Sequence, residues 1–117
     1  MEPTMDKRLA DMVLMIAESP AKPACHSILQ TNGILLHRHD HDKLRRSGLT
    51  RLSVSMDAID PALQKDLRNG TSLEKVLRNV REFMHECPQT RVEFITTVTS
   101  TNIDKVDDLI AAGLEMG

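Results

Sequence analysis

The sequence predicts an α/β fold in which about three parallel strands alternate with helices. Three segments have the apolar and β-branched patterns of strands, and helical spacing of apolar residues occurs before, between and after them. Consecutive strands that are joined by helical crossovers pair in parallel through right-handed connections. Three such strands cannot close a barrel. Residues 1–117 are therefore expected to form one piece of a single domain.

The predicted elements follow one another with short loops between them. One helix ends at Ser19-Pro20, where proline cannot continue it, and one strand ends at the turn signal Thr31-Asn32-Gly33. In order, the elements are a helix over 8–18, a strand over 26–30, a short helix within 37–48, a strand over 50–57, a short helix over 62–68, a helix from Thr71 to the Cys87-Pro88 pair, a strand over 91–99 and a last helix capped by Asn102.

Two of these elements have the clearest patterns. The strand over 50–57 alternates, which gives it one apolar and one polar face. Its apolar face holds Leu52, Val54 and Met56, and its polar face holds Arg51, Ser53, Ser55 and Asp57. The long helix starts with capping-box spacing between Thr71 and Glu74, and its apolar stripe must be covered by a sheet or another helix.

Composition excludes several classes of function. The net charge is −2, with both signs interspersed, and the chain has two Phe, no Tyr and no Trp. It therefore lacks the basic surface and the stacking rings that favour nucleic-acid binding. Its apolar stretches are far shorter than the about 20 residues of a membrane-spanning helix. Residues 1–8 lack the features of a secretory signal. We expect a cytoplasmic protein that binds neither nucleic acid nor membrane.

Cysteine and histidine offer few candidate metal ligands. Cys25 and Cys87 lie far apart in the sequence and are expected to be reduced, structural thiols. His37, His39 and His41 share the segment HRHDHD, whose imidazoles would face one side only if the chain were extended. Because this segment leads into a charged helix, we expect a solvated helix entry and no metal site.

Polar residues follow each predicted strand at its carboxyl end. Thr31 and Asn32 follow the first strand, Ser55 and Asp57 end the second, and residues 99–102 end the third. In parallel α/β folds this rim binds ligands, because strand ends and helix N-termini converge there. The alternative is that Thr31-Asn32-Gly33 is only a turn and that Asp57 only caps the following loop. Spacing alone does not choose between the two interpretations.

The order of several short motifs resembles the radical SAM superfamily, in the group that includes the molybdenum-cofactor cyclase and the SPASM-containing peptide-modifying enzymes. The motifs are EPT, TNGILL, SGLTRLSVSMDAIDP, RNGTSLEKVLRNV and a third strand that leads to TN, and they span nearly the whole chain. The resemblance implies a partial parallel β/α barrel of the radical SAM, TIM-like type. The Val-Ser-x-Asp strand would be the fourth of its six units, and the Thr-Asn-Gly turn would follow the third.

The resemblance also implies an enzyme with S-adenosylmethionine across the strand ends beside a [4Fe-4S] cluster, which forms a 5′-deoxyadenosyl radical to abstract hydrogen from a substrate. In the family a Gly-Gly-Glu-Pro stretch grips the methionine amino group; here Met1 stands in place of the second glycine and Glu2-Pro3 remain. Lys75 falls where some members place a basic residue for the methionine carboxylate. The residues that match cofactor-binding positions are Glu2, Thr31, Asn32, Ser55, Asp57 and Lys75.

The family's cluster motif, Cys-x3-Cys-x2-Cys, is absent from the sequence. Two separate cysteines cannot replace its three thiolates. We therefore expect a chain that is cut before the cluster loop, holds no cluster through its own cysteines and is inactive alone. The catalytic residues and the substrate, a small molecule or a peptide, cannot be read from the sequence. The alternative is a non-catalytic α/β remnant or association module, which would self-associate through the exposed edges of its outer strands.

Overall fold

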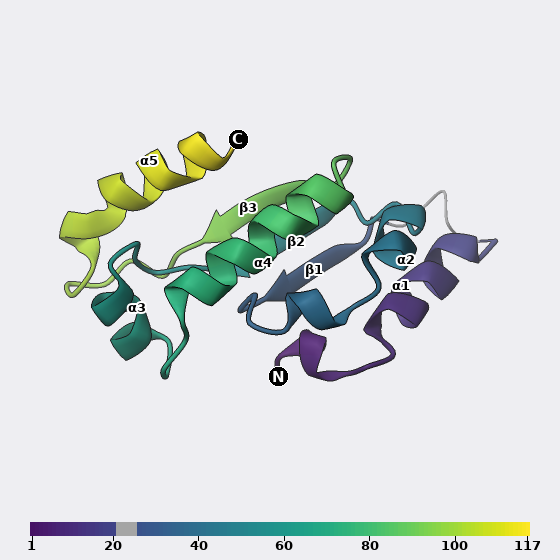
Figure 1. Cartoon of the computed structure of the whole chain (residues 1–117), viewed down its shortest axis with the longest axis horizontal. Coiled ribbons are helices and arrows are strands. Elements are labelled where there is room, and N and C mark those ends of the chain that lie inside the picture. The colour runs from purple at the N-terminus through teal and green to yellow at the C-terminus, as the bar shows by residue number, and fades with distance from the viewer. Residues whose placement is uncertain (21–25) are drawn as a thin grey trace.

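The computed structural model describes residues 1–20 and 26–117, and its centre is a three-stranded parallel sheet (Figure 1). The strands β1 (Ile28–Thr31), β2 (Arg51–Ser55) and β3 (Arg91–Ile95) lie side by side in chain order. The α-helices are α1 (Leu9–Glu18), α2 (His41–Arg46), α3 (Pro61–Leu67), α4 (Leu73–Glu86) and α5 (Val106–Met116), and the 3-10 helices are η1 (Pro3–Met5), η3 (Leu36–Arg38) and η4 (Ile103–Lys105). This arrangement confirms the predicted partial β/α barrel.

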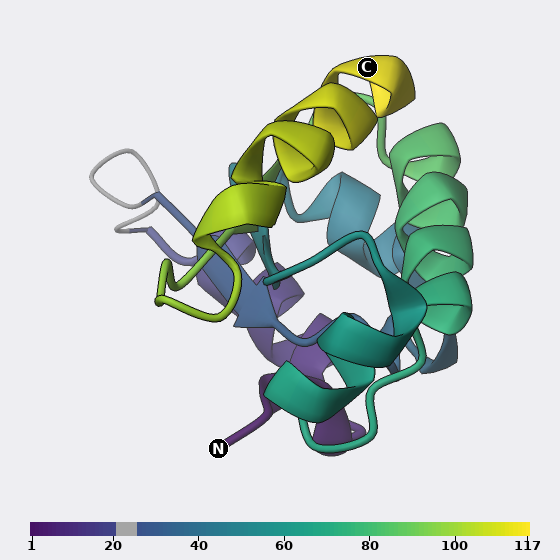
Figure 2. The same cartoon turned by 90° about the vertical axis from the view of Figure 1, so that its left-hand side faces the viewer.

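The core lies between β2 and α4, which runs alongside the sheet (Figures 1 and 2). The side chains of Leu52 and Val54 on β2 and of Met56 just after it are fully buried, as the alternation over 50–57 predicts. From α4, Val76, Val80 and Phe83 are fully buried against them. These side chains form the continuous apolar layer that a parallel sheet needs on a helix-covered face.

The first turn of α4 differs from the prediction. Ser72, and not Thr71, is the N-cap, and its hydroxyl accepts a hydrogen bond from the Lys75 amide at 3.4 Å. The capping box of Thr71 and Glu74 is therefore wrong. Asn69 and Gly70 turn the chain with φ angles of 48° and 83°, and Thr71 still belongs to this turn, where its hydroxyl donates to the Arg68 carbonyl at 2.6 Å.

The third strand is shorter than the predicted 91–99, because the chain after Ile95 hydrogen-bonds to the end of β2 in a different way. The Thr96 hydroxyl donates to the Met56 carbonyl at 2.7 Å, and the Thr97 amide donates to the Asp57 carboxylate at 2.9 Å. The Asp57 side chain thus accepts a hydrogen bond from the Thr97 amide, in place of a backbone carbonyl of a longer β2–β3 ladder. The first strand lies slightly further along the chain than the predicted 26–30, since it begins at Ile28 and extends to Thr31.

The histidine-rich segment is packed into the structure, so the predicted solvated helix entry is wrong for two of its three histidines. His39 and His41 are buried, and His37 is exposed. The His39 ring contacts the Thr4 carbonyl at 2.8 Å, whereas the His41 ring lies between the Glu86 carboxylate and the Leu36 carbonyl, at 2.5 and 3.0 Å. The rings serve as braces between segments, each with partners of its own.

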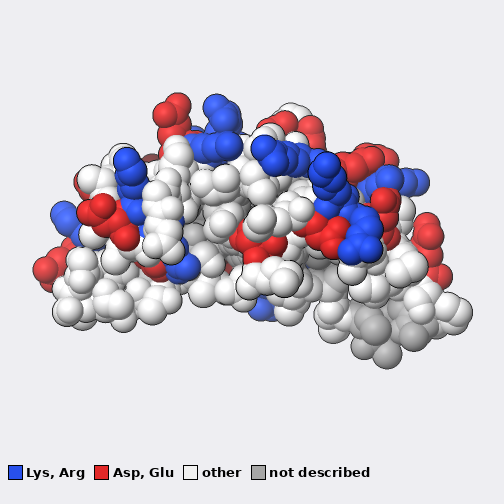
Figure 3. All heavy atoms as spheres, turned by 90° about the horizontal axis from the view of Figure 1, so that it is seen from below, with Lys and Arg blue, Asp and Glu red and all other residues white. Residues whose placement is uncertain are grey.

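The surface adds two observations. Acidic and basic side chains are interspersed on the face that Figure 3 shows, in agreement with the small net charge. Among the described residues, no helix is long and apolar enough to cross a membrane.

One hydrogen-bonded contact fixes the turn after β1 onto α4. The Asn79 amide, which is 1% exposed, donates to the carbonyls of Gly33 and Ile34 at 2.9 and 3.0 Å. Gly33 has a φ of 78°, and a Cβ atom there would lie 2.9 Å from a methyl carbon of Val76. The turn therefore needs glycine for its backbone angle and for its contact with α4.

We predict that Asn79→Ala destabilises the chain by about 1–3 kcal/mol, because it leaves the buried Gly33 carbonyl and the partly buried Ile34 carbonyl without their donor. The exposed Arg78, one residue earlier on α4, provides the control, and Arg78→Ala should change the free energy of unfolding by less than about 0.5 kcal/mol. Urea unfolding followed by circular dichroism measures both. Equal unfolding midpoints for Asn79→Ala and the wild type would contradict this role of Asn79.

Candidate functional site

A pocket of about 550 Å³ lies at the carboxyl ends of β1 and β2. Its walls come from the N-terminal residues, the ends of the two strands and the loop between α3 and α4. The polar lining residues include Glu2, Thr31, Asn32, Ser55, Arg68 and Asn69. The pocket therefore lies at the strand-end rim, which was one of the two interpretations that the sequence left open.

Glu2 is fixed in this pocket by the turn that follows β1. One carboxylate oxygen, Oε1, accepts from the Thr31 hydroxyl at 2.6 Å and from the amide and hydroxyl of Thr4 at 3.1 and 2.6 Å. The other, Oε2, accepts from the Asn32 amide at 2.7 Å. Residues about thirty positions apart thus meet at one carboxylate.

The same contacts keep Glu2 ionised. Burial raises the pKa of its carboxyl, but hydrogen bonds from Thr31, Thr4 and Asn32 together outweigh burial, and the pKa lies below its ordinary value of 4.5. Donors that point at a carboxylate favour its charged form. The pocket therefore presents a fixed negative charge at neutral pH.

The remaining predicted site residues fall into two groups. Ser55, at the end of β2, lines the pocket together with Glu2, Thr31 and Asn32. Asp57 and Lys75 are not among the residues that line it. Lys75 is half-buried in the first turn of α4. The structure therefore brings four of the six predicted residues together.

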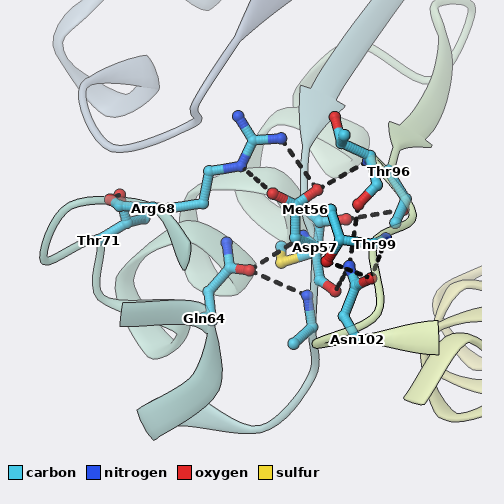
Figure 4. Close-up of polar contacts among 10 residues, drawn as sticks. Met56, Asp57, Gln64, Arg68, Thr71, Thr96, Thr99 and Asn102 are labelled. Atoms are coloured by element: carbon cyan, nitrogen blue, oxygen red, sulfur yellow. Dashed lines mark hydrogen bonds and ion pairs between the residues drawn. The ribbon is translucent and has the colours of Figure 1, made fainter. Parts of the chain in front are cut away.

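The Asp57 carboxylate is occupied by the protein itself (Figure 4). It is buried, and its Oδ1 accepts from Arg68 Nη2 and from the Thr97 amide, both at 2.9 Å. Its Oδ2 pairs with Arg68 Nε at 2.5 Å. One side chain thus joins the end of β2 to the α3–α4 loop and to the segment after β3.

Two buried amides hold the backbone around Asp57. The Gln64 carbonyl oxygen accepts from the amides of Asp57 and Ala58, both at 3.0 Å. The Asn102 amide group donates to the carbonyls of Asp57 and Thr97 at 3.0 Å, and its oxygen accepts from the Thr99 amide at 2.7 Å. Asn102 therefore braces the two strand ends, and the prediction that its side chain caps the last helix is wrong.

Arg68 and Gln64 were not recognised as parts of this region from the sequence, whereas Asn102 was expected at the rim but as a helix cap. Gln64 sits in a polar, apparently solvated helix, and yet it is fully buried. Arg68 precedes the Asn69-Gly70 turn, and its partner Asp57 lies eleven positions away, before α3 begins, so the period of one helix or strand does not relate the two. The only signal for this pair in the sequence was that Arg68 opens a motif that follows the motif with Asp57. A basic residue that follows an acidic residue is too common to indicate a specific pair.

The described residues do not fit an iron-sulfur cluster. They contain no group of three or more His, Cys, Asp or Glu side chains that could hold a metal ion. Cys87 is buried at the end of α4, where its thiol donates to the His41 carbonyl at 3.3 Å. Burial raises the pKa of this thiol to about 11, which favours the protonated form over the thiolate that binds metal. Cys25 lies outside the described residues.

We predict that the Glu2 carboxylate stabilises the fold at neutral pH and loses this effect in acid. Its pKa is lower in the folded chain, so its contribution is present above the ordinary value of 4.5 and disappears as the pH falls through the folded value. Urea midpoints at pH 7 and at about pH 3 should therefore differ less for Glu2→Gln than for the wild type. The exposed Glu82→Gln variant is the control and should follow the wild type. If Glu2→Gln loses as much stability in acid as Glu82→Gln does, Glu2 is not held as described.

Residues 1–112 match the model of the radical SAM superfamily. A probable GTP 3′,8-cyclase of Sulfurisphaera tokodaii is 27% identical over 117 residues, which cover 99% of this chain and 36% of that protein. A GTP 3′,8-cyclase of Peptoclostridium acidaminophilum is 32% identical over 84 residues, which cover 71% of this chain and 25% of that protein. A probable GTP 3′,8-cyclase of Archaeoglobus fulgidus is 29% identical over 110 residues, which cover 93% of this chain and 35% of that protein. The chain spans about a third, or less, of these relatives and belongs to the radical SAM superfamily of enzymes.

Proposed function

We propose that this chain is the central part of a radical SAM enzyme and that its pocket binds S-adenosylmethionine. The observation that carries the proposal is the Glu2 carboxylate, which the turn after β1 holds ionised in a polar pocket at the strand ends. Full-length members of the superfamily use S-adenosylmethionine with a [4Fe-4S] cluster, which together supply a 5′-deoxyadenosyl radical for hydrogen abstraction. The pocket of about 550 Å³ falls within the range of about 300–1,000 Å³ that ligand pockets occupy.

The chemistry of the lining fits the amino end of the cofactor. Oε1 of Glu2 already accepts three hydrogen bonds, whereas Oε2 accepts one and has capacity for a donor from a ligand. An ammonium group supplies such donors together with a positive charge. The Ser55 hydroxyl, across the rim on β2, can donate to or accept from a polar group of the same ligand.

We propose that the full-length protein acts on a small-molecule substrate. The three relatives are named as GTP cyclases, and by those names they act on a small molecule. This favours a small molecule over a peptide.

A second candidate function is association with another chain. The outer edges of β1 and β3 have no strand partner in the described sheet, and Ile28 and Ile95 on them are 57% and 37% exposed. Open edges with apolar side chains favour pairing with other strands. Sedimentation at several chain concentrations separates the two functions, since self-association does not require the pocket.

Cofactor binding is tested by titrating S-adenosylmethionine into the chain while amide resonances are recorded by NMR. We expect concentration-dependent shifts at Thr31, Asn32 and Ser55. Glu2→Gln should weaken binding about tenfold or more, because a charged hydrogen bond is lost. Glu82→Gln should bind as the wild type does. Shifts confined to residues away from the rim, or no shifts at millimolar cofactor, would refute the proposed site.

We further propose that the chain alone does not cleave the cofactor, because its described residues hold no cluster ligands. Incubation of the purified chain with S-adenosylmethionine and dithionite should give no 5′-deoxyadenosine above the rate without protein. The product is measured by liquid chromatography, and a complete radical SAM enzyme serves as the positive control. Protein-dependent 5′-deoxyadenosine would overturn this part of the proposal.

A further inference from the structure

His41 is a buried histidine that does not line the pocket. It is the first residue of α2, and its side chain is 5% exposed. Its ring nitrogen Nδ1 lies 2.5 Å from a carboxylate oxygen of Glu86, the last residue of α4. The other ring nitrogen, Nε2, lies 3.0 Å from the carbonyl oxygen of Leu36, the first residue of η3. One ring thus joins three elements, η3, α2 and α4.

Both atoms that the His41 ring meets are oxygens that accept hydrogen bonds. A backbone carbonyl has no proton to donate, so Nε2 carries a hydrogen and donates it to Leu36. A neutral histidine has one ring hydrogen, which Nε2 has then used. The contact between Nδ1 and Glu86 therefore needs a second proton, held by the ring or by the carboxyl group. The pair carries one proton more than a neutral histidine beside a carboxylate.

The two neighbouring histidines of the same segment do not need a second proton. The Nε2 atom of His39 lies 2.8 Å from the Thr4 carbonyl oxygen, which one ring hydrogen satisfies. His37 is exposed, and its Nδ1 lies 3.2 Å from the Asn79 amide nitrogen, which donates, so this ring nitrogen accepts. Among the hydrogen bonds of the described residues, the two acceptors at opposite sides of one ring belong to His41.

Among the described residues, Glu86 is the ionisable side chain that hydrogen-bonds the His41 ring. The Phe83 ring packs on it edge to face, with the ring centroids 5.4 Å apart. Burial raises the pKa of the Cys87 thiol to about 11, so this thiol stays protonated through neutral pH while it donates to the His41 carbonyl. The other charged or ionisable groups on η3, α2 and the end of α4 pair elsewhere or face solvent, namely Asp40 with the Lys43 amide, Asp42 with Arg45 and Arg46, Lys43 with Asp11, and the exposed His37, Arg38 and His85. His41 and Glu86 therefore set the proton count of this contact.

We infer that His41 and Glu86 hold one shared proton at neutral pH, and that release of this proton opens the contact between α2 and α4. Without the proton, one of the two oxygens would face a ring nitrogen that has no hydrogen. The Leu36 carbonyl belongs to a fully buried residue, whereas the Glu86 side chain is 49% exposed and can turn to water. Glu86 is therefore the partner that leaves, which makes the junction of α2 with α4 a pH-sensitive contact.

The direction of the pH dependence is set by the number of protons that the folded and unfolded chains bind. In an unfolded chain a histidine loses its proton at about pH 6.5 and a glutamate at about pH 4.3. Between these values the unfolded chain and the folded pair hold the same number of protons. Above about pH 6.5 the unfolded chain has lost a proton that the folded pair retains, so stability falls as the pH rises, by up to about tenfold in the folding equilibrium constant per pH unit.

The test compares urea unfolding of the wild type and of Glu86→Gln at about pH 6 and about pH 8. A glutamine amide can donate to Nδ1 of a neutral ring, so Glu86→Gln keeps the contact without the second proton. Between the two pH values the folding equilibrium constant of the wild type should fall about tenfold more than that of Glu86→Gln. Glu82→Gln, at an exposed position of the same helix, is the matched control and should follow the wild type. Equal falls for the wild type and Glu86→Gln would overturn the shared proton, because a contact without it does not depend on pH.

A second measurement on the wild type does not depend on any variant. The ring resonances of His41 and of the exposed His85 are followed by NMR as the pH is raised. The His41 resonances should change only above the range in which His85 loses its proton, because Glu86 holds the proton in the buried contact. A change that coincides with that of His85, or no change up to about pH 10, would overturn the inference.

Discussion

The parallel register of the three strands is the constraint on which the rest of the structure depends. Thr31 lies beside Val54, Val54 lies beside Phe94, and the ladder between β2 and β3 continues to Ser55 and Ile95. The strands therefore end almost level, and the segments that follow them emerge at one rim. A shift of the register by one residue would move every side chain to the opposite face. It would expose Leu52 and Val54 and remove Ser55 from the pocket.

At this rim the backbone ladder is replaced by side chains. Beyond Ser55 and Ile95, the Asp57 carboxylate and the Asn102 amide take over the hydrogen bonds that further strand residues would make. Such buried polar groups are costly unless each has its partners. Here the carboxylate accepts hydrogen bonds from Arg68 and Thr97, and the Asn102 amide bonds three backbone groups, whereas Gln64 Nε2 and Arg68 Nε are buried without a hydrogen-bond partner among the described residues.

The sequence predicted the parts of this structure that depend on periodicity and missed those that depend on pairing. The buried face of β2 and the stripe of α4 followed from spacings of two and of three to four residues, because burial on one side imposes those periods. The resemblance supplied Glu2, Thr31, Asn32 and Ser55 in the pocket. In contrast, the burial of His41 beside Glu86 and the pairing of Asp57 with Arg68 depend on residues that the fold brings together from distant positions. No local pattern records such a meeting, so His41 was expected to be solvated and Asp57 was expected to meet a ligand or to cap a loop.

The contact of Asn79 with the carbonyl of Gly33 has a consequence for how the chain folds. It joins residues 46 positions apart, and the contact of Glu2 with Asn32 joins residues 30 positions apart. Loop closure over such separations costs conformational entropy before any contact compensates it, and chains dominated by distant contacts fold slowly. The turn that receives Glu2 has hydrogen bonds of its own from Thr31 and Asn32, but its carbonyls find their donor on α4, so we expect the ligand pocket to be completed only after α4 docks.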